Sequence, residues 1–332
     1  MNAHDRLRRL GLSIAAGLAM AACGGAALAQ AAQGTWPTKP IRLLVAGPPG
    51  GTADALARLA AEGLKDLGQP VIVEAKPGGS GVIAINDLLA NGHDGHTLLV
   101  IQVGAVSEMP LVNKVRFQPF KDMKPLAQIS RTGLVLVTNK ALSLATVGDV
   151  VKYGRSQKDG LDFASYATGM KGHTLGIQFG HLTHLKMHHV GYKGSPQALV
   201  DLMGGQVPLM FDGVTTSLPL IKGGKINAVA VSYPTRIGAL PDVPTFKELG
   251  YPQLAQASWF AVWSRPDVAP DIQQKIRDAT LRHFDQPAVR RGLQDMGMEP
   301  GQPLSSEAMM ADARAAYEQQ AALLKSINFQ PE

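Results

Sequence analysis

The sequence predicts an α/β protein of two lobes, each a sheet flanked by helices. Short apolar runs alternate with Gly-rich loops and amphipathic segments, which is typical of strand–loop–helix units. The pattern restarts after about residue 138, and 332 residues are enough for two domains. Hydrophobic residues make up 45% of the chain and charged residues 17%, as in ordinary soluble globular proteins.

The N-terminus has the features of an export signal. Arginines precede an apolar stretch at residues 10–22, and a small-x-small cleavage site follows at residues 27–29. We therefore expect residues 1–29 to be a signal peptide and the mature protein to be periplasmic. The pair Arg8 and Arg9 leaves a twin-arginine signal open.

Cys23 is the only cysteine, and it leaves a lipid anchor open as an alternative to simple cleavage. Either form of processing predicts a mature protein without a disulfide. The formal net charge of +6 is spread thinly, and aromatic residues are only 5% of the chain. Because no long run of Lys or Arg occurs, we expect no nucleic-acid partner.

The first predicted unit is a strand at residues 41–45, a Gly/Pro turn at residues 46–51 and an amphipathic helix. The first N–H groups of a helix have no intrahelical partner, so a helix that starts at this turn is suited to bind an anion. The turn lacks the lysine of a Walker A loop and the spacing of G-x-G-x-x-G, so a nucleotide is not implied.

Similar units follow along the chain. Strands at residues 71–74 and 97–101 precede Gly-containing loops at residues 76–81 and 102–105, and residues 133–138 form a further strand. Strands that alternate with helices predict a parallel sheet, in which ligands bind beyond the carboxyl ends of the strands.

The second lobe begins with a capping-box helix at residues 146–153. Its expected strands occupy residues 161–165, 186–190, 207–211 and 225–232. A strand at residues 258–264 and helices at residues 270–284, 287–296 and 305–327 complete the chain. We expect lobe 1 to comprise residues 30–138 plus 234–332 and lobe 2 residues 139–233.

Several motifs, in order along the chain, resemble those of one receptor family. They are Trp36-Pro37, Pro48-Pro49-Gly50-Gly51, Pro77-Gly78-Gly79-Ser80-Gly81, Tyr192-Lys193-Gly194-Ser195 and Leu240-Pro241-Asp242-Val243-Pro244. The chain thus resembles Bug-type solute-binding proteins, the extracytoplasmic receptors of tripartite tricarboxylate transporters.

This resemblance implies a periplasmic-binding-protein fold of the second structural type, with a ligand cleft between the lobes. It implies a monomer that has no enzymatic activity and needs no cofactor. Its ligand would be a small carboxylate (a di- or tricarboxylate, an amino acid or an aromatic acid), which it delivers to membrane permease subunits.

The resemblance also implies the ligand-binding residues, which hold the carboxylate mainly through backbone N–H groups, small hydroxyls and water. They are Gly47, Pro49, Gly50, Gly51, Thr52, Gly79, Ser80, Gly81, Gln102, Gly104, Ser165, Tyr166, Thr168, Gly169, Lys171 and Asp212. In amino-acid-binding members the residue matching Asp212 contacts the ligand's ammonium group. A structural role at the end of a strand is the alternative for Asp212.

Two departures from the family pattern bear on the ligand. Ala46-Gly47 replaces the usual Pro-Phe, so an aromatic wall is missing, and we expect Tyr166 to replace part of it. Lys171 adds a cation to a loop that is usually built of small residues. We therefore expect Lys171 to favour a di- or tricarboxylate.

Other polar residues have structural explanations. Asp54 suits the first turn of a helix, and Tyr192 and Lys193 are expected to fix their loop. The histidines at positions 181, 184 and 188 have helical spacing, but residues 186–190 read as a strand, so we expect no metal site.

Two other functions stay open at this point. A ligand sensor that acts with a signalling partner would carry the same binding motifs. A secreted hydrolase is the alternative from another class, but the chain has no G-x-S-x-G motif and its candidate serines lack a base partner in the sequence.

Overall fold

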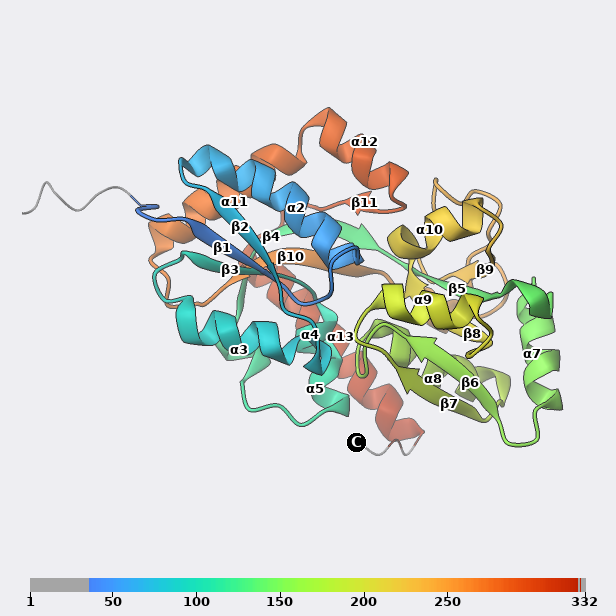
Figure 1. Ribbon diagram of the computed structural model, residues 1–332. Coiled ribbons are helices and arrows are strands. Elements are labelled where there is room, and N and C mark those ends of the chain that lie inside the picture. Colours follow the sequence, from blue (N-terminus) through green and yellow to red (C-terminus); the bar gives the residue numbers. More distant parts are fainter. Residues whose placement is uncertain (1–35, 328, 330–332) are drawn as a thin grey trace, which may run out of the picture. The chain divides into compact units, whose positions relative to one another are not determined.

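Two mixed sheets flanked by helices organise the chain (Figure 1). The computed structural model describes residues 36–327 and residue 329, so the expected signal peptide at residues 1–29 and Cys23 lie outside the described residues. Both sheets belong to one compact unit, Pro40–Glu332. In the described part of the chain, no helix is both long and apolar enough to cross a membrane.

The first sheet has six strands. In spatial order they are β11 (Glu299–Pro300), β4 (Lys124–Thr132), β10 (Ser258–Ser264), β3 (Thr97–Gln102), β1 (Ile41–Val45) and β2 (Val71–Ala75). Strands β2, β1 and β3 are parallel, whereas β10, β4 and β11 pair antiparallel. All six residues of β3 are buried, because helices cover both faces of this sheet.

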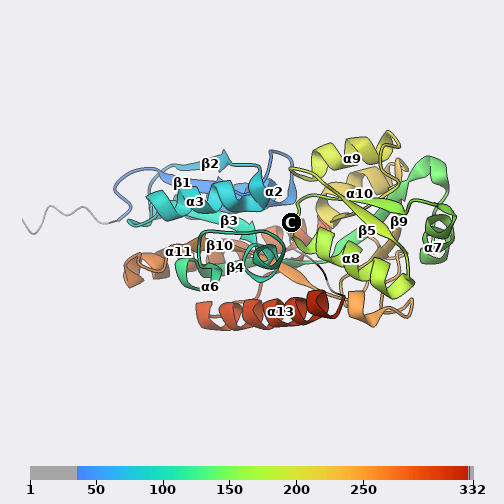
Figure 2. The same ribbon diagram turned by 90° about the horizontal axis from the view of Figure 1, so that it is seen from below.

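Helices α2 (Thr52–Leu64) and α11 (Pro270–Phe284) pack together on one face of the first sheet (Figure 1). Leu56, Ala60 and Leu64 form the fully buried stripe of α2. Helices α3 (Val82–Asn91), α4 (Gly104–Ser107) and α13 (Ser306–Ser326) contribute to the hydrophobic core on the other face. Figure 2 shows α13 on one side of the first sheet, where it contacts β4.

Short elements complete this half. They are η1 (Lys65–Leu67), η2 (Gly79–Gly81), α5 (Met109–Val112), α6 (Pro119–Asp122) and α12 (Pro287–Asp295).

The second sheet has five strands. Their order is β7 (Met187–Gly191), β6 (Leu161–Ser165), β8 (Leu209–Gly213), β5 (Leu134–Asn139) and β9 (Ile226–Val231). Helices α7 (Val147–Ser156) and α8 (Lys171–Thr183) pack into one core cluster with this sheet. Helices α9 (Ser195–Met203) and α10 (Val214–Lys222) pack into another. The predicted capping box of α7 is present, with Thr146 and Asp149 bonded reciprocally.

The chain passes between the sheets at two neighbouring crossings. One is the turn between β4 and β5 at Gly133. The other runs from Ser232, after β9, to the start of β10 and contains η4 (Pro252–Leu254). Ser232 N donates to Leu134 O at 2.8 Å, and Leu134 N donates to Ser232 Oγ at 2.9 Å. A Cβ at position 133 would lie 2.6 Å from Tyr233 N, so only glycine fits where the crossings meet.

The structure corrects three details of the predicted fold. The sheets are mixed rather than parallel, because β4, β5 and β10 run against their neighbours. Strand β5, expected in the first lobe, pairs with β8 and β9 in the second sheet. Strand β4 and helix α10 were not predicted; β4 contains Pro125 and several polar residues, which obscure its strand pattern.

Candidate functional site

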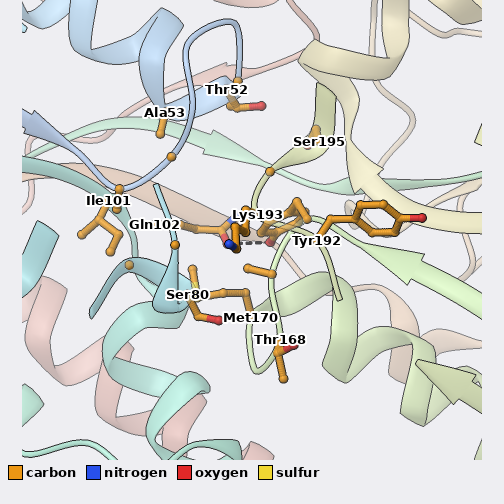
Figure 3. Close-up of a pocket in the computed structure, with 18 of the residues that line it drawn as sticks. Thr52, Ala53, Ser80, Ile101, Gln102, Thr168, Met170, Tyr192, Lys193 and Ser195 are labelled. Atoms are coloured by element: carbon orange, nitrogen blue, oxygen red, sulfur yellow. Dashed lines mark hydrogen bonds between the residues drawn. The ribbon is translucent and has the colours of Figure 1, made fainter. Parts of the chain in front are cut away.

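A cavity of about 520 Å³ lies where the loops of the two sheets face one another (Figure 3). This volume falls in the range of small-molecule sites. Figure 3 shows Thr52, Ile101 and Gln102 on one side, Ser195 on another, and Thr168 and Met170 below. The walls therefore come from both halves of the molecule.

The loop after β1 brings the N-terminus of α2 to the cavity. Gly51 is the N-cap residue, its backbone is extended, and no side chain caps the helix. Gly51, Thr52 and Ala53 line the cavity, so the first unpaired N–H groups of α2 are presented there. Asp54 Oδ2 accepts from Gly50 N at 3.1 Å and from Arg58 Nε at 3.0 Å. The expected structural role of Asp54 is thus supported by its partners.

The second loop and the end of β3 form the adjoining wall. Gly79, Ser80 and Gly81 line the cavity, and all three have positive φ angles. Gln102 is the last residue of β3 and also lines the cavity. Gly104 does not: it is buried behind this wall, beside Met170.

The loop after β6 supplies the facing wall. Tyr166 and Thr168 line the cavity, and the Tyr166 hydroxyl donates to Gln102 Oε1 at 2.8 Å. Tyr166 therefore brings an aromatic side chain to the cavity, and its replacement of the missing aromatic wall stays a prediction. Ser165 and Gly169 are buried and do not line the cavity; Gly169 N donates to His173 Nδ1 at 3.0 Å.

Two stacked histidines support this loop from behind. The rings of His173 and His189 lie 3.7 Å apart between centroids, and His189 Nε2 is 2.7 Å from Ser165 Oγ. Burial, together with the neighbouring His189, lowers the pKa of His173 to about 3. Burial also lowers the pKa of His189 to about 4. Both rings are therefore neutral at neutral pH.

The N-terminus of α9 reaches the cavity from the second sheet. Gly194 and Ser195 line it, and Gly194 (φ +139°) packs so closely on Pro48 that a Cβ would lie 2.3 Å from Pro48 Cγ. Pro196 occupies the first turn of this helix, as predicted. Helices α2 and α9 thus direct their N-termini at one space from opposite halves of the molecule.

Asp212 holds this second N-terminus in place instead of lining the cavity. Its carboxylate is fully buried and accepts hydrogen bonds from the hydroxyls of Ser195, Thr216 and Ser217. Burial raises the pKa of Asp212, although these hydroxyl donors oppose the shift. These contacts give Asp212 the structural role that the sequence left as an alternative.

Lys171 does not face the cavity either. Its Nζ lies 2.6 Å from Glu108 Oε1 and donates to Gln256 Oε1 at 3.0 Å. Both members of the ion pair are buried. Lys171 is therefore paired with Glu108 instead of lining the cavity, and its selection of a di- or tricarboxylate stays a prediction.

The predicted ligand-binding residues thus fall into two groups. Those that line the cavity are Gly47, Gly51, Thr52, Gly79, Ser80, Gly81, Gln102, Tyr166 and Thr168. Those that do not are Pro49, Gly50, Gly104, Ser165, Gly169, Lys171 and Asp212. Pro49 and Gly50 are exposed on the outer side of the first loop.

Further lining residues were not among the predicted ligand-binding set. They include Asn113, Lys114, Thr132, Tyr192, Lys193, Ser195 and Phe260. The Tyr192 ring points away from the cavity, and its hydroxyl donates to Asp201 at 2.7 Å, so its expected loop-fixing role is supported (Figure 3). In the sequence, Lys193 could have been found from its place in a loop at a strand end, and Ser195 from its place at a helix start.

The charges around the cavity are of one sign. Lys114 and Lys193 line it, whereas none of the described lining residues is Asp, Glu, His or Cys. Neither lysine forms an ion pair with another described residue. With two helix N-termini nearby, the site attracts anions, and its lining offers no nucleophile–base pair for catalysis.

The histidines at positions 181, 184 and 188 do not share one helix. Helix α8 ends at Thr183, His184 has a left-handed backbone conformation, and His188 lies in β7, as the sequence predicted. Among residues 36–327 and 329, no group of three or more His, Cys, Asp or Glu side chains is placed to hold a metal ion.

Known proteins are similar to this chain in architecture and in sequence. BugT of Bordetella pertussis is 34% identical over 241 residues, which are 72% of this chain and 74% of that protein. A solved R. palustris protein with adipate has 30% identity and a TM-score of 0.85, covering 90% of this chain and 100% of that one. MatC of Rhodopseudomonas palustris, with bound malate, has 27% identity and a TM-score of 0.81 over 87% of this chain and 100% of its own.

The sequence model of one family spans most of the chain. Residues 56–329 match the model described as "Tripartite tricarboxylate transporter family receptor". The fold is that of two-lobed periplasmic binding proteins, and the family consists of binding proteins rather than enzymes. The chain therefore belongs to the TctC family of tripartite tricarboxylate transporter receptors, as the Bug-type motifs predicted.

Proposed function

We propose that this periplasmic solute-binding receptor captures a small carboxylate in the cavity between its lobes. The observation that carries the proposal is the convergence of the α2 and α9 N-termini on a cavity lined by two lysines and by no described acidic residue. Backbone N–H groups at helix starts bind carboxylates at hydrogen-bond distance. Hydroxyls of Thr52, Ser80 and Thr168 and bridging water supply further contacts.

The charge pattern favours a ligand with carboxylates and no ammonium group. An amino acid would bring an ammonium into a cavity where no described lining residue is acidic, since Asp212 is buried among hydroxyls. Adipate and malate in the solved relatives are both dicarboxylates. A dicarboxylate is therefore the ligand class that we place first among those expected.

The remaining parts of the function follow from the family. We propose that the receptor acts as a monomer and delivers its ligand to the permease subunits of a tripartite tricarboxylate transporter. We also propose that residues 1–29 direct export, with Cys23 as an alternative lipid attachment site. The lobes would be those expected from the sequence, with the boundary moved so that β5 belongs to lobe 2.

A thermal-shift comparison of matched compounds tests the proposal. Adipate and malate should raise the unfolding temperature, and at 100-fold Kd a ligand stabilises the folded protein by about 2.7 kcal/mol. Adipamide keeps the length of adipate without its charge and should have no effect at the same ionic strength. Equal stabilisation by adipamide, or no stabilisation by any di- or tricarboxylate, would contradict carboxylate recognition.

A further inference from the structure

A hydrogen bond across the cavity joins Gln102 and Tyr166. Gln102 ends β3 in the first sheet, and Tyr166 follows β6 in the second. The Tyr166 hydroxyl donates to Gln102 Oε1 at 2.8 Å, and both residues line the cavity (Figure 3). The bond therefore exists only while the two lobes are together.

The Tyr166 hydroxyl is the donor of this bond, because the carboxamide oxygen of Gln102 can only accept. Burial raises the pKa of Tyr166, and the nearby charge of Glu108 raises it further. The phenol thus stays protonated and remains a donor.

A carboxamide has one oxygen and one NH2 group, so occupying the oxygen determines where the NH2 group points. No described residue accepts a hydrogen bond from Gln102 Nε2, and this nitrogen is not among the buried side-chain atoms without a partner. The Nε2 donors are therefore the part of Gln102 available to the cavity.

We propose that Tyr166 is a positioning residue, which turns Gln102 so that its Nε2 donates to an oxygen of the ligand. The proposal rests on the proposed function, because the group recognised is a carboxylate. It assigns Tyr166 a role beyond that of an aromatic wall. The complete donor set would form only when the lobes close on the ligand.

The chain offers a matched pair of variants. Tyr166 packs against three hydrophobic core clusters, so Tyr166→Phe keeps the ring and removes only the hydroxyl. Tyr251 packs against the core of the second sheet and is not among the residues that line the cavity, so Tyr251→Phe is the control.

The first measurement needs no ligand. In protein labelled with ¹⁵N-glutamine, the Gln102 carboxamide signals are identified by their loss in Gln102→Leu. We expect Tyr166→Phe to shift these signals and Tyr251→Phe to leave them unchanged. Gln102 signals that do not move in Tyr166→Phe would overturn the positioning role.

The second measurement is calorimetric titration with adipate and with malate. Tyr166→Phe should weaken binding about tenfold, as expected when an oriented hydrogen bond to a charged group is lost, and Tyr251→Phe should not. In a Gln102→Met background, Tyr166→Phe should cause no further loss. An undiminished loss in that background would show that Tyr166 acts without Gln102 and would overturn the proposal.

The two measurements distinguish a failure of this inference from a failure of the proposed function on which it rests. Wild-type protein that binds no carboxylate contradicts the proposed function, and the carboxamide signals still decide whether Tyr166 orients Gln102.

Discussion

The buried imidazole pair behind the loop after β6 shows how single residues shape this site. His173 accepts from Gly169 N, and His189 contacts Ser165 Oγ, so the stack holds the loop that carries Tyr166 and Thr168. Protonating either ring would place a charge in a buried stack with Phe163. The fold therefore keeps both histidines neutral.

This pair predicts a pH dependence of stability. The pKa values of about 3 for His173 and about 4 for His189 lie below the ordinary histidine value of 6.5, so the unfolded chain takes up protons first on acidification. These two groups thus leave stability unchanged above pH 6.5 and lower it between pH 6.5 and about 4. Each contributes about 1.4 kcal/mol per pH unit inside that window.

Urea unfolding between pH 7.5 and pH 5 checks the expectation. His189→Gln should reduce the proton uptake on unfolding by about one, whereas His181→Gln, at an exposed position of α8, should not. Equal proton uptake in the wild type and His189→Gln would contradict the assignment.

The sequence was least informative about the contacts of single side chains. It identified Asp212 and Lys171 as chemically capable residues but not their partners from other segments, which are Ser195 for Asp212 and Glu108 for Lys171. The Gly-rich loops were more predictable, because glycines at strand ends place backbone rather than side chains at the site. Lys114 carries no local pattern and reaches the cavity only through the fold.

At the scale of elements, a buried ion pair joins α8 to the segment between α4 and α5. Glu108 lies between those two short helices, and Lys171 is the first residue of α8. Thr174 Oγ1 also donates to Glu108 Oε2 at 2.6 Å. The carboxylate thus sits at the N-terminus of α8, where negative charge is favoured.

Breaking this pair should be costly, since it leaves one buried charge without its partner. We expect Lys171→Met and Glu108→Gln each to lower the free energy of unfolding by about 3–5 kcal/mol. The double variant should recover much of that loss, because both charges are gone. Chemical unfolding of the four proteins gives the coupling energy.

The exposed pair Lys65–Glu62 provides the control. Its atoms are 2.7 Å apart, but both side chains are more than half exposed, at 51% and 59%. Lys65→Met should therefore cost less than about 1 kcal/mol. If Lys171→Met cost no more than that, the buried pair would not be stabilising the contact between these elements.

The predicted order of strands and helices was correct for most of both sheets, because apolar runs bounded by glycines are local signals. The direction of β10 and the existence of β4 were not accessible in this way. Strand β4 is buried because it lies between β10 and β11, which come from residues more than 120 positions later. The local pattern of apolar and polar residues does not indicate pairing with strands from distant parts of the chain.

At the scale of the whole molecule, two crossings connect the lobes, and the cavity lies between the two lobes. Contacts from both lobes enclose it, including Pro48 against Gly194 and Tyr166 with Gln102. Two-lobed binding proteins close around their ligands by hinge motion. Ligand binding and lobe closure should therefore depend on the same cavity.

Gly47 allows a direct test of that dependence. It lines the cavity, its φ is not in the left-handed region, and an added Cβ would meet only Ala53 Cβ at 4.0 Å. Gly47→Trp should therefore fill the cavity without disturbing the fold. Gly238, exposed and with nothing within 4 Å of an added Cβ, provides the control variant Gly238→Trp.

Calorimetric titration of these three proteins with adipate and malate is the most direct measurement of carboxylate binding in the cavity. The wild type and Gly238→Trp should bind at least one of the two anions with equal affinity, and Gly47→Trp should bind neither while unfolding at the same temperature as the unliganded wild type. Undiminished binding by Gly47→Trp would contradict the assignment of this cavity as the carboxylate site.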